Sequence, residues 1–406
     1  MIKPNLVVFS HLRWSFVHQR PQHLLSRLAQ HWSITFIEEP LMCEGLPFLQ
    51  ESHTEESITV VVPRTPLTDP GFHENQVEVL QPLIQGWLAR QGIDHPVVWL
   101  YTPMALPLAR VLDPVCMVYD CMDELSAFKD APRRLWQHER ALMQEAALVL
   151  TGGPSLFEAR RRLNPNVHCI PSSVDAAHFS PSRLDCSSQA AQDVQALQGH
   201  IGGPKLGFFG VIDERMDVAL MTHLADAQPL WQIVMVGPVV KIDPATLPRQ
   251  GNIHWLGMQD YQRLPYFLAG WDVCLMPFAL NEATRFISPT KTLEYMAGGK
   301  PVVSTAVNDV VSMYGMAVEV AYAYSGFVRA CERLLAASDT AREVRSREMA
   351  SLVAAGSWER SASKVNTLLC EARDMALRCP FSARRLPVPQ GELPLEMTPD
   401  PVSTPW

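Results

Sequence analysis

The 406-residue chain is long enough for two or three domains, each with a core of its own. Its 47% hydrophobic and 19% charged residues are ordinary for a folded, soluble protein and exclude extensive disorder. A formal net charge of −8 argues against a protein that coats nucleic acid, so no nucleic-acid partner is expected.

The nine cysteines indicate neither a disulfide framework nor a zinc site, because no two of them have CxxC spacing. Most lie within apolar runs. We therefore expect buried, reduced thiols, which are typical of a cytoplasmic protein.

No segment is predicted to cross a membrane. The apolar run near the amino terminus, residues 6–9, is too short for a signal peptide. The longest apolar tract, residues 264–280, is interrupted by two prolines and an aspartate, whereas a membrane span needs about 20 apolar residues. We expect a soluble, cytoplasmic protein, with contact at the inner face of the membrane left open.

Short apolar runs alternate with helical patterns through the first part of the chain. Strands are predicted at residues 6–9, 34–37, 58–62, 97–101, 115–119 and 148–151. Helical patterns fall between several of them, such as residues 21–32 and 133–147. This alternation indicates βαβ units and a parallel sheet that is covered on both faces.

The pattern breaks between residues 172 and 204, where Ser, Ala, Gln, Asp and Gly predominate, and we place the domain boundary there. A second alternating series follows. Its strands are predicted at residues 205–209, 232–236, 253–255, 273–276 and 301–304, with a helix at 290–297. The sequence therefore predicts an α/β protein in which two Rossmann-like, parallel-sheet domains face a cleft.

Ligands of open parallel sheets bind at the carboxyl ends of the strands, close to the free N–H groups of helix N-termini. In the second domain, Ser288 is predicted to cap a helix whose first residue is Pro289. The free amides of this turn suit a phosphate, and Lys291 adds a positive charge. Glu294 lies on the same helical face and can accept hydrogen bonds from ribose hydroxyls. A surface Lys–Glu pair on an ordinary capped helix is the alternative interpretation.

Residues 293–303 read Leu-Glu-Tyr-Met-Ala-Gly-Gly-Lys-Pro-Val-Val. This run resembles the donor-binding signature of retaining GT-B glycosyltransferases, the family called glycosyl transferases group 1, whose usual form is Leu-Glu-x-Met-Ala-x-Gly-x-Pro-Val-Val. Segments at 174–179, 205–215 and 252–278 are similar to other parts of the family and occur in the same order. The set extends over most of the chain.

The resemblance implies a nucleoside-diphosphate sugar as donor and a saccharide or lipid-linked acceptor, in the synthesis of cell-surface polysaccharide or glycoconjugate. It implies that the product keeps the anomeric configuration of the donor sugar. Donor binding is assigned to Gly210, Arg215, Ile287, Ser288, Pro289, Thr290, Lys291 and Glu294.

Two positions depart from the family's pattern. Many members carry a second Glu eight residues before the one at 294, where it contacts the donor sugar, but this chain has Phe286. The family also commonly has an Arg and a Lys after the first strand of the second domain, and here only Arg215 is present. We expect Arg215 and Lys291 to neutralise the leaving diphosphate. No Asp-x-Asp motif is present, so neither a metal nor another cofactor is expected.

The first domain is expected to hold the acceptor. His11, Arg13 and Arg20 follow its first predicted strand and precede a helix, so they predict a pocket for an acceptor or a phosphate. As an alternative, either arginine pairs with Glu38 or Glu39, at the end of the next strand.

Asp120 and Asp123 follow another predicted strand, residues 115–119, and can bind sugar hydroxyls or orient an acceptor. Asp123 can instead cap the next helix. Asp120 joins Arg215 and Lys291 as a candidate catalytic residue. Should the reaction invert the anomeric centre, a general base is needed, and Asp120 and the histidines at 11 and 18 are the candidates.

With these roles the chain divides into five segments. Residues 1–180 form an N-terminal Rossmann-like acceptor domain, 181–203 a linker, and 204–356 a C-terminal Rossmann-like domain for the nucleotide sugar. Residues 357–378 resemble the family's C-terminal helix, which crosses back onto the first domain. Residues 379–406 contain seven prolines and are predicted to form an extended or disordered tail.

Two other functions use the same fold. An NDP-sugar epimerase needs carboxylates and histidines in the cleft for proton transfer, and a phosphorylase needs a pyridoxal-phosphate lysine; neither signature is clear in this sequence. The other alternative is a non-catalytic subunit that binds a sugar nucleotide.

Overall fold

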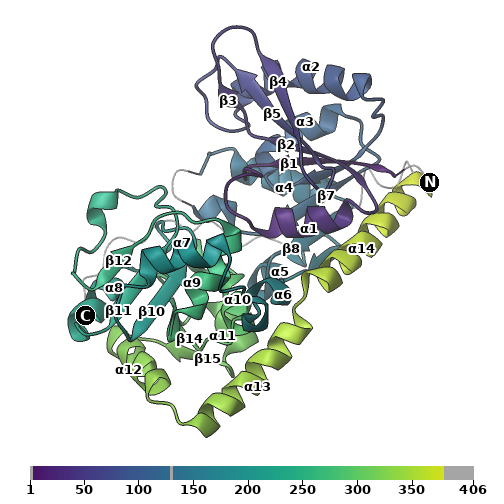
Figure 1. Ribbon diagram of the computed structural model, residues 1–406. Coiled ribbons are helices and arrows are strands. Elements are labelled where there is room, and N and C mark those ends of the chain that lie inside the picture. The colour runs from purple at the N-terminus through teal and green to yellow at the C-terminus, as the bar shows by residue number, and fades with distance from the viewer. Residues whose placement is uncertain (1–2, 129–130, 379–406) are drawn as a thin grey trace, which may run out of the picture.

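The protein consists of two α/β domains, and its computed structural model describes residues 3–128 and 131–378 (Figure 1). The fold class predicted from the sequence is confirmed, because each domain is built on a largely parallel sheet flanked by helices. The predicted proline-rich tail, residues 379–406, lies outside the described residues.

The first domain contains a nine-stranded sheet in the order β3-β5-β2-β1-β6-β7-β8-β9, with β4 paired to β5. All of its strand pairs are parallel except β4 with β5. The strands are β1 (Asn5–Ser10), β2 (Ser33–Glu38), β3 (Leu41–Met42), β4 (Phe48–His53), β5 (Thr59–Thr65), β6 (Val97–Leu100), β7 (Cys116–Cys121), β8 (Leu148–Thr151) and β9 (Val167–Cys169).

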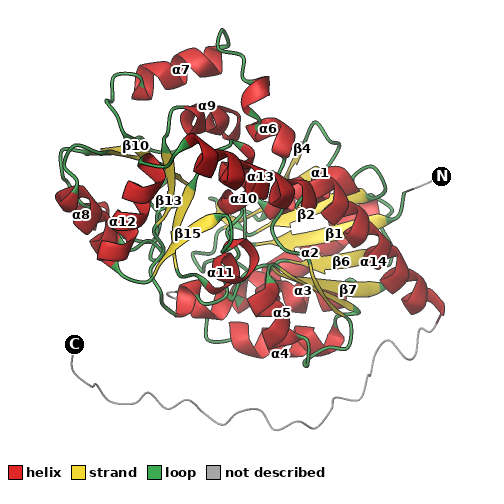
Figure 2. Cartoon of the chain, turned by 90° about the horizontal axis from the view of Figure 1, so that it is seen from below, coloured by secondary structure: helices red, strands yellow, loops and turns green. Residues whose placement is uncertain are grey.

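Helices cover both faces of this sheet, as Figure 2 shows. Successive residues of β1 explain why: Leu6 and Val8 pack into the core on one face, and Val7 and Phe9 into the core on the other. The sequence of a strand that is buried on both faces is therefore an unbroken run of apolar residues. The helices of this domain are α1 (Arg20–Leu28), α2 (Glu74–Arg90), α3 (Leu106–Val111), α4 (Leu135–Glu145) and α5 (Pro154–Arg160).

The second domain contains a six-stranded parallel sheet in the order β12-β11-β10-β13-β14-β15. Its strands are β10 (Lys205–Phe209), β11 (Gln232–Val236), β12 (Ile253–Trp255), β13 (Val273–Met276), β14 (Val302–Thr305) and β15 (Val318–Ala321). Its helices are α8 (Val218–Ala227), α9 (Leu264–Ala269), α10 (Lys291–Ala297), α11 (Asn308–Tyr314), α12 (Tyr324–Leu335) and α13 (Asp339–Ala355).

The segment between the two sheets is partly helical. It contains the short α6 (Ala176–Phe179) and then α7 (Gln189–Gln198), whose N-terminus is capped by the Ser188 side chain. Val194 of α7 packs into the apolar cluster that also contains α9 residues. Much of the predicted linker therefore packs on the second domain.

The last described helix, α14 (Trp358–Arg378), lies along α1 of the first domain (Figure 1). Its buried residues Trp358, Ala362, Val365 and Leu369 recur at helical spacing and join the same core as β1. The chain thus ends its described part on the domain with which it began.

Strands β3, β4, β9 and β15 were not predicted. The sequence of β4, Phe-Leu-Gln-Glu-Ser-His, lacks apolar alternation because the strand lies at the edge of the sheet with most residues exposed. The other three are only two to four residues long.

Replacing Trp358 with Ala is expected to lower the free energy of unfolding by about 3–5 kcal/mol, because its ring is fully buried and stacks on His23 at 4.7 Å. Urea denaturation followed by near-ultraviolet circular dichroism measures the loss. Trp136 is 56% exposed, so Trp136→Ala is the control and should change little. Equal effects of the two changes would contradict this account of α14.

Candidate functional site

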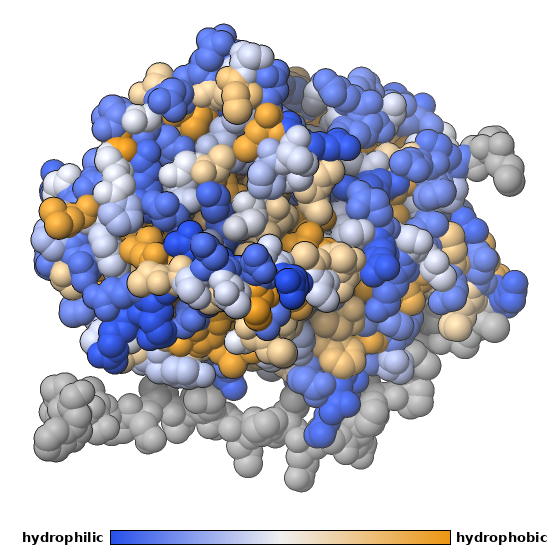
Figure 3. Space-filling view, turned by 60° about the horizontal axis from the view of Figure 1, so that its bottom comes forward, coloured by the Kyte–Doolittle hydropathy of each residue, from blue (hydrophilic) through white to orange (hydrophobic). Residues whose placement is uncertain are grey.

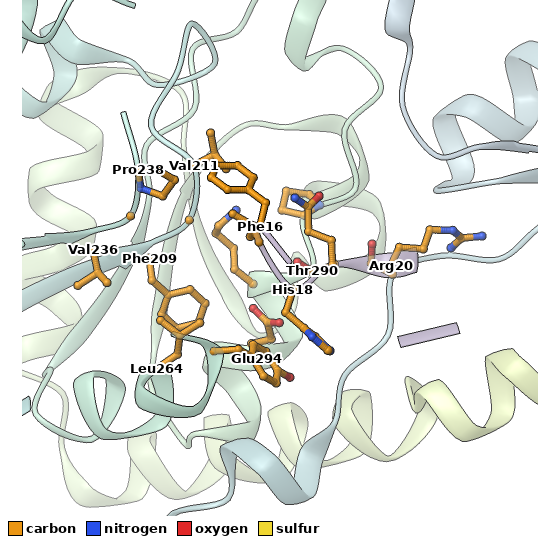
Figure 4. A pocket seen from close by; sticks show the side chains of 18 of the residues that line it. Phe16, His18, Arg20, Phe209, Val211, Val236, Pro238, Leu264, Thr290 and Glu294 are labelled. Atoms are coloured by element: carbon orange, nitrogen blue, oxygen red, sulfur yellow. The ribbon is translucent and has the colours of Figure 1, made fainter. Parts of the chain in front are cut away.

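A pocket of about 380 Å³ lies between the domains, where the carboxyl ends of the two sheets face each other. We call it the interdomain pocket. The first domain lines it with loops that follow β1, β7 and β8, and the second with loops that follow β10, β11 and β12 and with the start of α10. In Figure 4 the side chains of Phe209, His18 and Glu294 lie around the pocket. The position agrees with the rule for ligand sites of open parallel sheets.

Two glycines keep the second domain's side of the pocket free of side chains. Gly210 and Gly237 follow β10 and β11 and have φ values of 137° and 146°. A Cβ on Gly237 would lie 1.9 Å from the carbonyl oxygen of Gly210. Only glycine can therefore stand at 237, and the backbones of both loops are open to a ligand.

The start of α10 differs from the prediction. The helix begins at Lys291 with Thr290 at the N-cap, so Ser288 does not cap it. Instead, the Ser288 carbonyl accepts a hydrogen bond of 2.9 Å from Ser172 of the first domain. Ser288 lines the pocket, and its hydroxyl is buried without a partner among the described residues. Ile287, Pro289 and Thr290 also line the pocket.

Lys291 and Glu294 both line the interdomain pocket and influence each other's ionisation. The Lys291 Nζ lies 5.4 Å and 5.2 Å from the ring centroids of Phe208 and Phe278. Burial lowers the pKa of Lys291, and the positive charge of Arg215 lowers it further. Burial raises the pKa of Glu294, against the opposing effect of Lys291. A ligand that bears negative charge and hydroxyl groups would favour the ionised form of both.

Arg215 lines the pocket and is held by Asp213. Its Nη2 donates to the carboxylate at 2.7 Å and its Nε at 3.0 Å. The guanidinium also lies 5.5 Å from the ring centroid of Phe128, which belongs to the first domain. Lys241, a cation that sequence reasoning missed, lies 4.9 Å from the same ring. No sequence signal marks it, because it stands in a loop whose course depends on both domains.

The structure corrects the assignment of Asp120. This carboxylate is fully buried, is not among the residues that line the pocket, and binds Arg20 through a contact of 2.9 Å. Arg20 also donates to the carbonyl of Ile170 at 2.7 Å, and in Figure 4 its side chain extends away from Glu294. The pair is structural, because a buried charge is stable only with a partner.

For Arg13 the structure supports the alternative interpretation, in which the arginine pairs with a carboxylate. It pairs with Glu38 at 3.0 Å and does not line the interdomain pocket. His11 is likewise outside the pocket lining, and burial lowers its pKa to about 4. Arg20, by contrast, is among the residues that line the interdomain pocket, although its guanidinium is bound to Asp120. Of the three residues predicted to form a pocket, His11, Arg13 and Arg20, only Arg20 therefore lies at the interdomain pocket. Asp123 does line the interdomain pocket, and burial raises its pKa while Arg215 opposes the shift.

A column of stacked rings closes one side of the pocket. The ring of His18 in the first domain stacks on the ring of Tyr261 in the second, with 4.4 Å between their centroids. The ring of His178 also stacks on Tyr261, at 4.1 Å. Burial lowers the pKa of His18 to about 4, so it is neutral at pH 7. Sequence reasoning did not place Tyr261 in the site because the contact joins loops from different domains.

Phe286 stands where many relatives of the resembled family have a glutamate. Its side chain packs against the apolar core of the first domain that contains Tyr119 and Leu156. The ring therefore contributes to the contact between the domains, next to the pocket-lining Ile287.

Among the described residues, no group of three or more His, Cys, Asp or Glu side chains is placed to hold a metal ion. In the same part of the chain, no helix has the length and apolar character needed to cross a membrane. Figure 3 shows a face on which hydrophilic residues predominate and hydrophobic ones gather in small groups. Cys116, Cys121, Cys274 and Cys331 are buried and unbridged, as expected, whereas Cys186 is exposed.

Residues 203–337 match the family described as glycosyl transferases group 1. A protein of Bacillus subtilis (strain 168), provisionally named the teichuronic acid biosynthesis glycosyltransferase TuaH, is 29% identical over 253 residues. That match covers 56% of this chain and 61% of the relative, so the chain spans less than two thirds of the relative's length.

Solved structures with much lower identity share the whole two-domain fold. Sucrose-phosphate synthase from Thermosynechococcus elongatus is 16% identical with a TM-score of 0.69, over 92% of this chain and 100% of that one. The E. coli trehalose-6-phosphate structure bound with UDP-2-fluoro glucose is 12% identical with a TM-score of 0.65, over 90% and 98%. The fold expected from the resemblance is thus confirmed: the chain shares the two-domain GT-B fold of these structures, and its residues 203–337 match the glycosyl transferases group 1 model.

Proposed function

We propose that this protein is a glycosyltransferase that moves a sugar from a nucleoside-diphosphate donor to a saccharide or lipid-linked acceptor. The observation that carries the proposal is the joint position of Lys291 and Glu294 in the interdomain pocket, beside the side-chain-free loops at Gly210 and Gly237. A cation, a carboxylate and exposed backbone groups within one pocket suit a diphosphate and a ribose.

The leaving diphosphate gains negative charge as its bond to the sugar breaks. Lys291 and Arg215 supply positive charge at the pocket, and the low dielectric of a buried site strengthens their effect. Glu294 accepts hydrogen bonds from the ribose hydroxyls.

The acceptor enters from the first domain, whose residues Asp123 and His18 line the same pocket. Retention of configuration follows from the resemblance to the retaining family, in which the acceptor attacks from the side of the leaving group and the phosphate takes its proton. We propose a role in the synthesis of cell-surface polysaccharide or glycoconjugate at the cytoplasmic face of the membrane, in line with the role named for the Bacillus subtilis relative.

Replacing Glu294 with Gln is expected to weaken nucleoside-diphosphate binding about ten- to a hundredfold, because a charge-assisted hydrogen bond contributes about 1.5–3 kcal/mol. A thermal-shift series with UDP, GDP, ADP and dTDP identifies the nucleotide, and calorimetry then measures its Kd. The Glu282 side chain is 79% exposed, so Glu282→Gln serves as the control. Unchanged affinity in Glu294→Gln would remove this residue from the donor site.

Replacing Lys291 or Arg215 with Ala is expected to lower kcat by more than it weakens binding of the free nucleoside, because the diphosphate charge grows in the transition state. The loss expected is about a hundredfold for Lys291, in the range seen when one charge-stabilising donor is removed. Lys364→Ala, an exposed change far from the pocket, should leave kcat unchanged.

The pH dependence provides a second measure of the same role. Because the pKa of Lys291 is lowered, its positive charge is present below that pKa and is lost as the pH rises through it. The kcat/KM of the native enzyme should therefore fall on the alkaline side, and Lys291→Arg should remove that fall. Full kcat in Lys291→Ala would place the counter-charge elsewhere.

Activity is expected to survive EDTA, and the first-formed product should keep the anomeric configuration of the donor. Lys291 and Arg215 can replace a metal as the counter-charge of the diphosphate. Proton NMR of the first product gives the anomeric coupling directly. An inverted product would require a general base, for which the pocket offers His18 and Asp123. Loss of activity in EDTA, restored by Mg²⁺ or Mn²⁺, would refute the metal-free mechanism.

A further inference from the structure

A second hollow, of about 790 Å³, adjoins the interdomain pocket on the first domain. Trp14, Ser15 and Phe16 line both of them. A long molecule whose end lies in the interdomain pocket can therefore pass over these three residues into the second hollow. We call this hollow the β4–β5 groove.

One face of the β4–β5 hairpin forms the wall of this groove. The two strands are antiparallel, with Gln50 opposite Val62 and Ser52 opposite Val60. Alternate residues of a strand point to the same face, and these four, together with Arg64, line the groove. The groove is thus made partly by β5, which the sequence pattern predicted, and partly by β4, which it did not.

The lining combines apolar surfaces with hydrogen-bonding groups. Trp14 and Phe16 supply aromatic rings, and Phe16 is 43% exposed. Gln50, Ser52 and Thr54 supply amide and hydroxyl groups, which both donate and accept. A sugar unit has the matching character, with apolar C–H faces and a rim of hydroxyls.

The charges of the groove disfavour an anionic ligand. Arg13 is bound to Glu38 at 3.0 Å, and Arg64 donates to the side-chain oxygen Oε1 of Gln50 at 2.7 Å and 3.0 Å. Glu55 and Glu56 add negative charge to the lining. The three carboxylates of the lining, Glu38 included, outnumber its two guanidinium groups, so the net negative charge disfavours a phosphate or uronate.

We propose that the β4–β5 groove is an acceptor subsite, which holds the sugar units of an uncharged oligosaccharide behind the unit that receives the new sugar. The inference rests on the proposed function, because it takes the interdomain pocket as the place of transfer. The groove makes the length of the acceptor chain a determinant of the reaction rate, since each further unit in the groove adds contacts.

The test is a kinetic comparison of acceptors by length. The probes are uncharged hexose and N-acetylhexosamine oligosaccharides of one to six units, and chains of equal length that contain uronic acid. For the native enzyme, kcat/KM should rise by about tenfold between two and four units, as one or two hydrogen bonds would provide. Ser52→Trp, which fills the groove, should abolish this gain and leave the nucleotide Kd unchanged. Ser351→Trp, the same change at an exposed site on α13, should retain it.

Four results would overturn the proposal: rates independent of length, a gain that survives in Ser52→Trp, a preference for uronic acid chains, or no transfer to any uncharged chain while the nucleotide sugar still binds and is hydrolysed. The failure of the proposed function looks different. In that case no nucleoside diphosphate binds at the interdomain pocket, or Glu294→Gln leaves its affinity unchanged.

Discussion

The site depends on the contacts that hold the carboxyl ends of the two sheets against each other. The chain passes from one domain to the other near Val174 and again near Gly356. These two places are adjacent, because the Val174 amide donates a hydrogen bond of 2.9 Å to the Gly356 carbonyl. Beyond this point α14 buries Trp358 in the first domain, and the Arg27 guanidinium binds Glu359. The two crossings thus lie next to each other.

Direct contacts near the pocket then fix the distance between the domains. Asp309, at the start of α11, is buried and accepts a hydrogen bond of 3.0 Å from the Ser155 amide of the first domain. A Cβ on Gly153 would lie 2.0 Å from the Asp309 carboxylate. Together with the bond between Ser172 and the Ser288 carbonyl, these contacts join the first domain to α11 and to the loop that precedes α10. The position of Lys291 in the pocket is therefore set by both domains.

The sequence was sufficient to predict which side chains lie together where those side chains belong to one continuous segment. Lys291 and Glu294 stand three residues apart on one helix, so local periodicity alone predicts that they share a face, and both line the pocket. The partners of the two arginines could not be predicted in this way. Arg20 is separated from Asp120 by 100 residues and Arg13 from Glu38 by 25, and no local pattern decides between a carboxylate partner and a ligand.

The same limit applies to the edge of the first sheet. Central strands such as β1 are buried on both faces and read as apolar runs, but β4 is exposed and polar, and its conformation follows from pairing with β5. A helix cap is equally sensitive to contacts from outside the segment. Ser288 has the right residue type for a cap, yet the first domain engages its carbonyl and the helix starts at Lys291.

The ionisation of Lys291 and Glu294 links these contacts to the proposed binding of the donor. In the protein alone, burial disfavours the charged form of Lys291 and of Glu294, and each charge is offset mainly by the other. In the function proposed here, a diphosphate would bring negative charge to Lys291 and raise its pKa, and ribose hydroxyls that donate to Glu294 would lower the pKa of that carboxylate. Donor binding in that function would favour the charged form of both side chains, against the effect of burial.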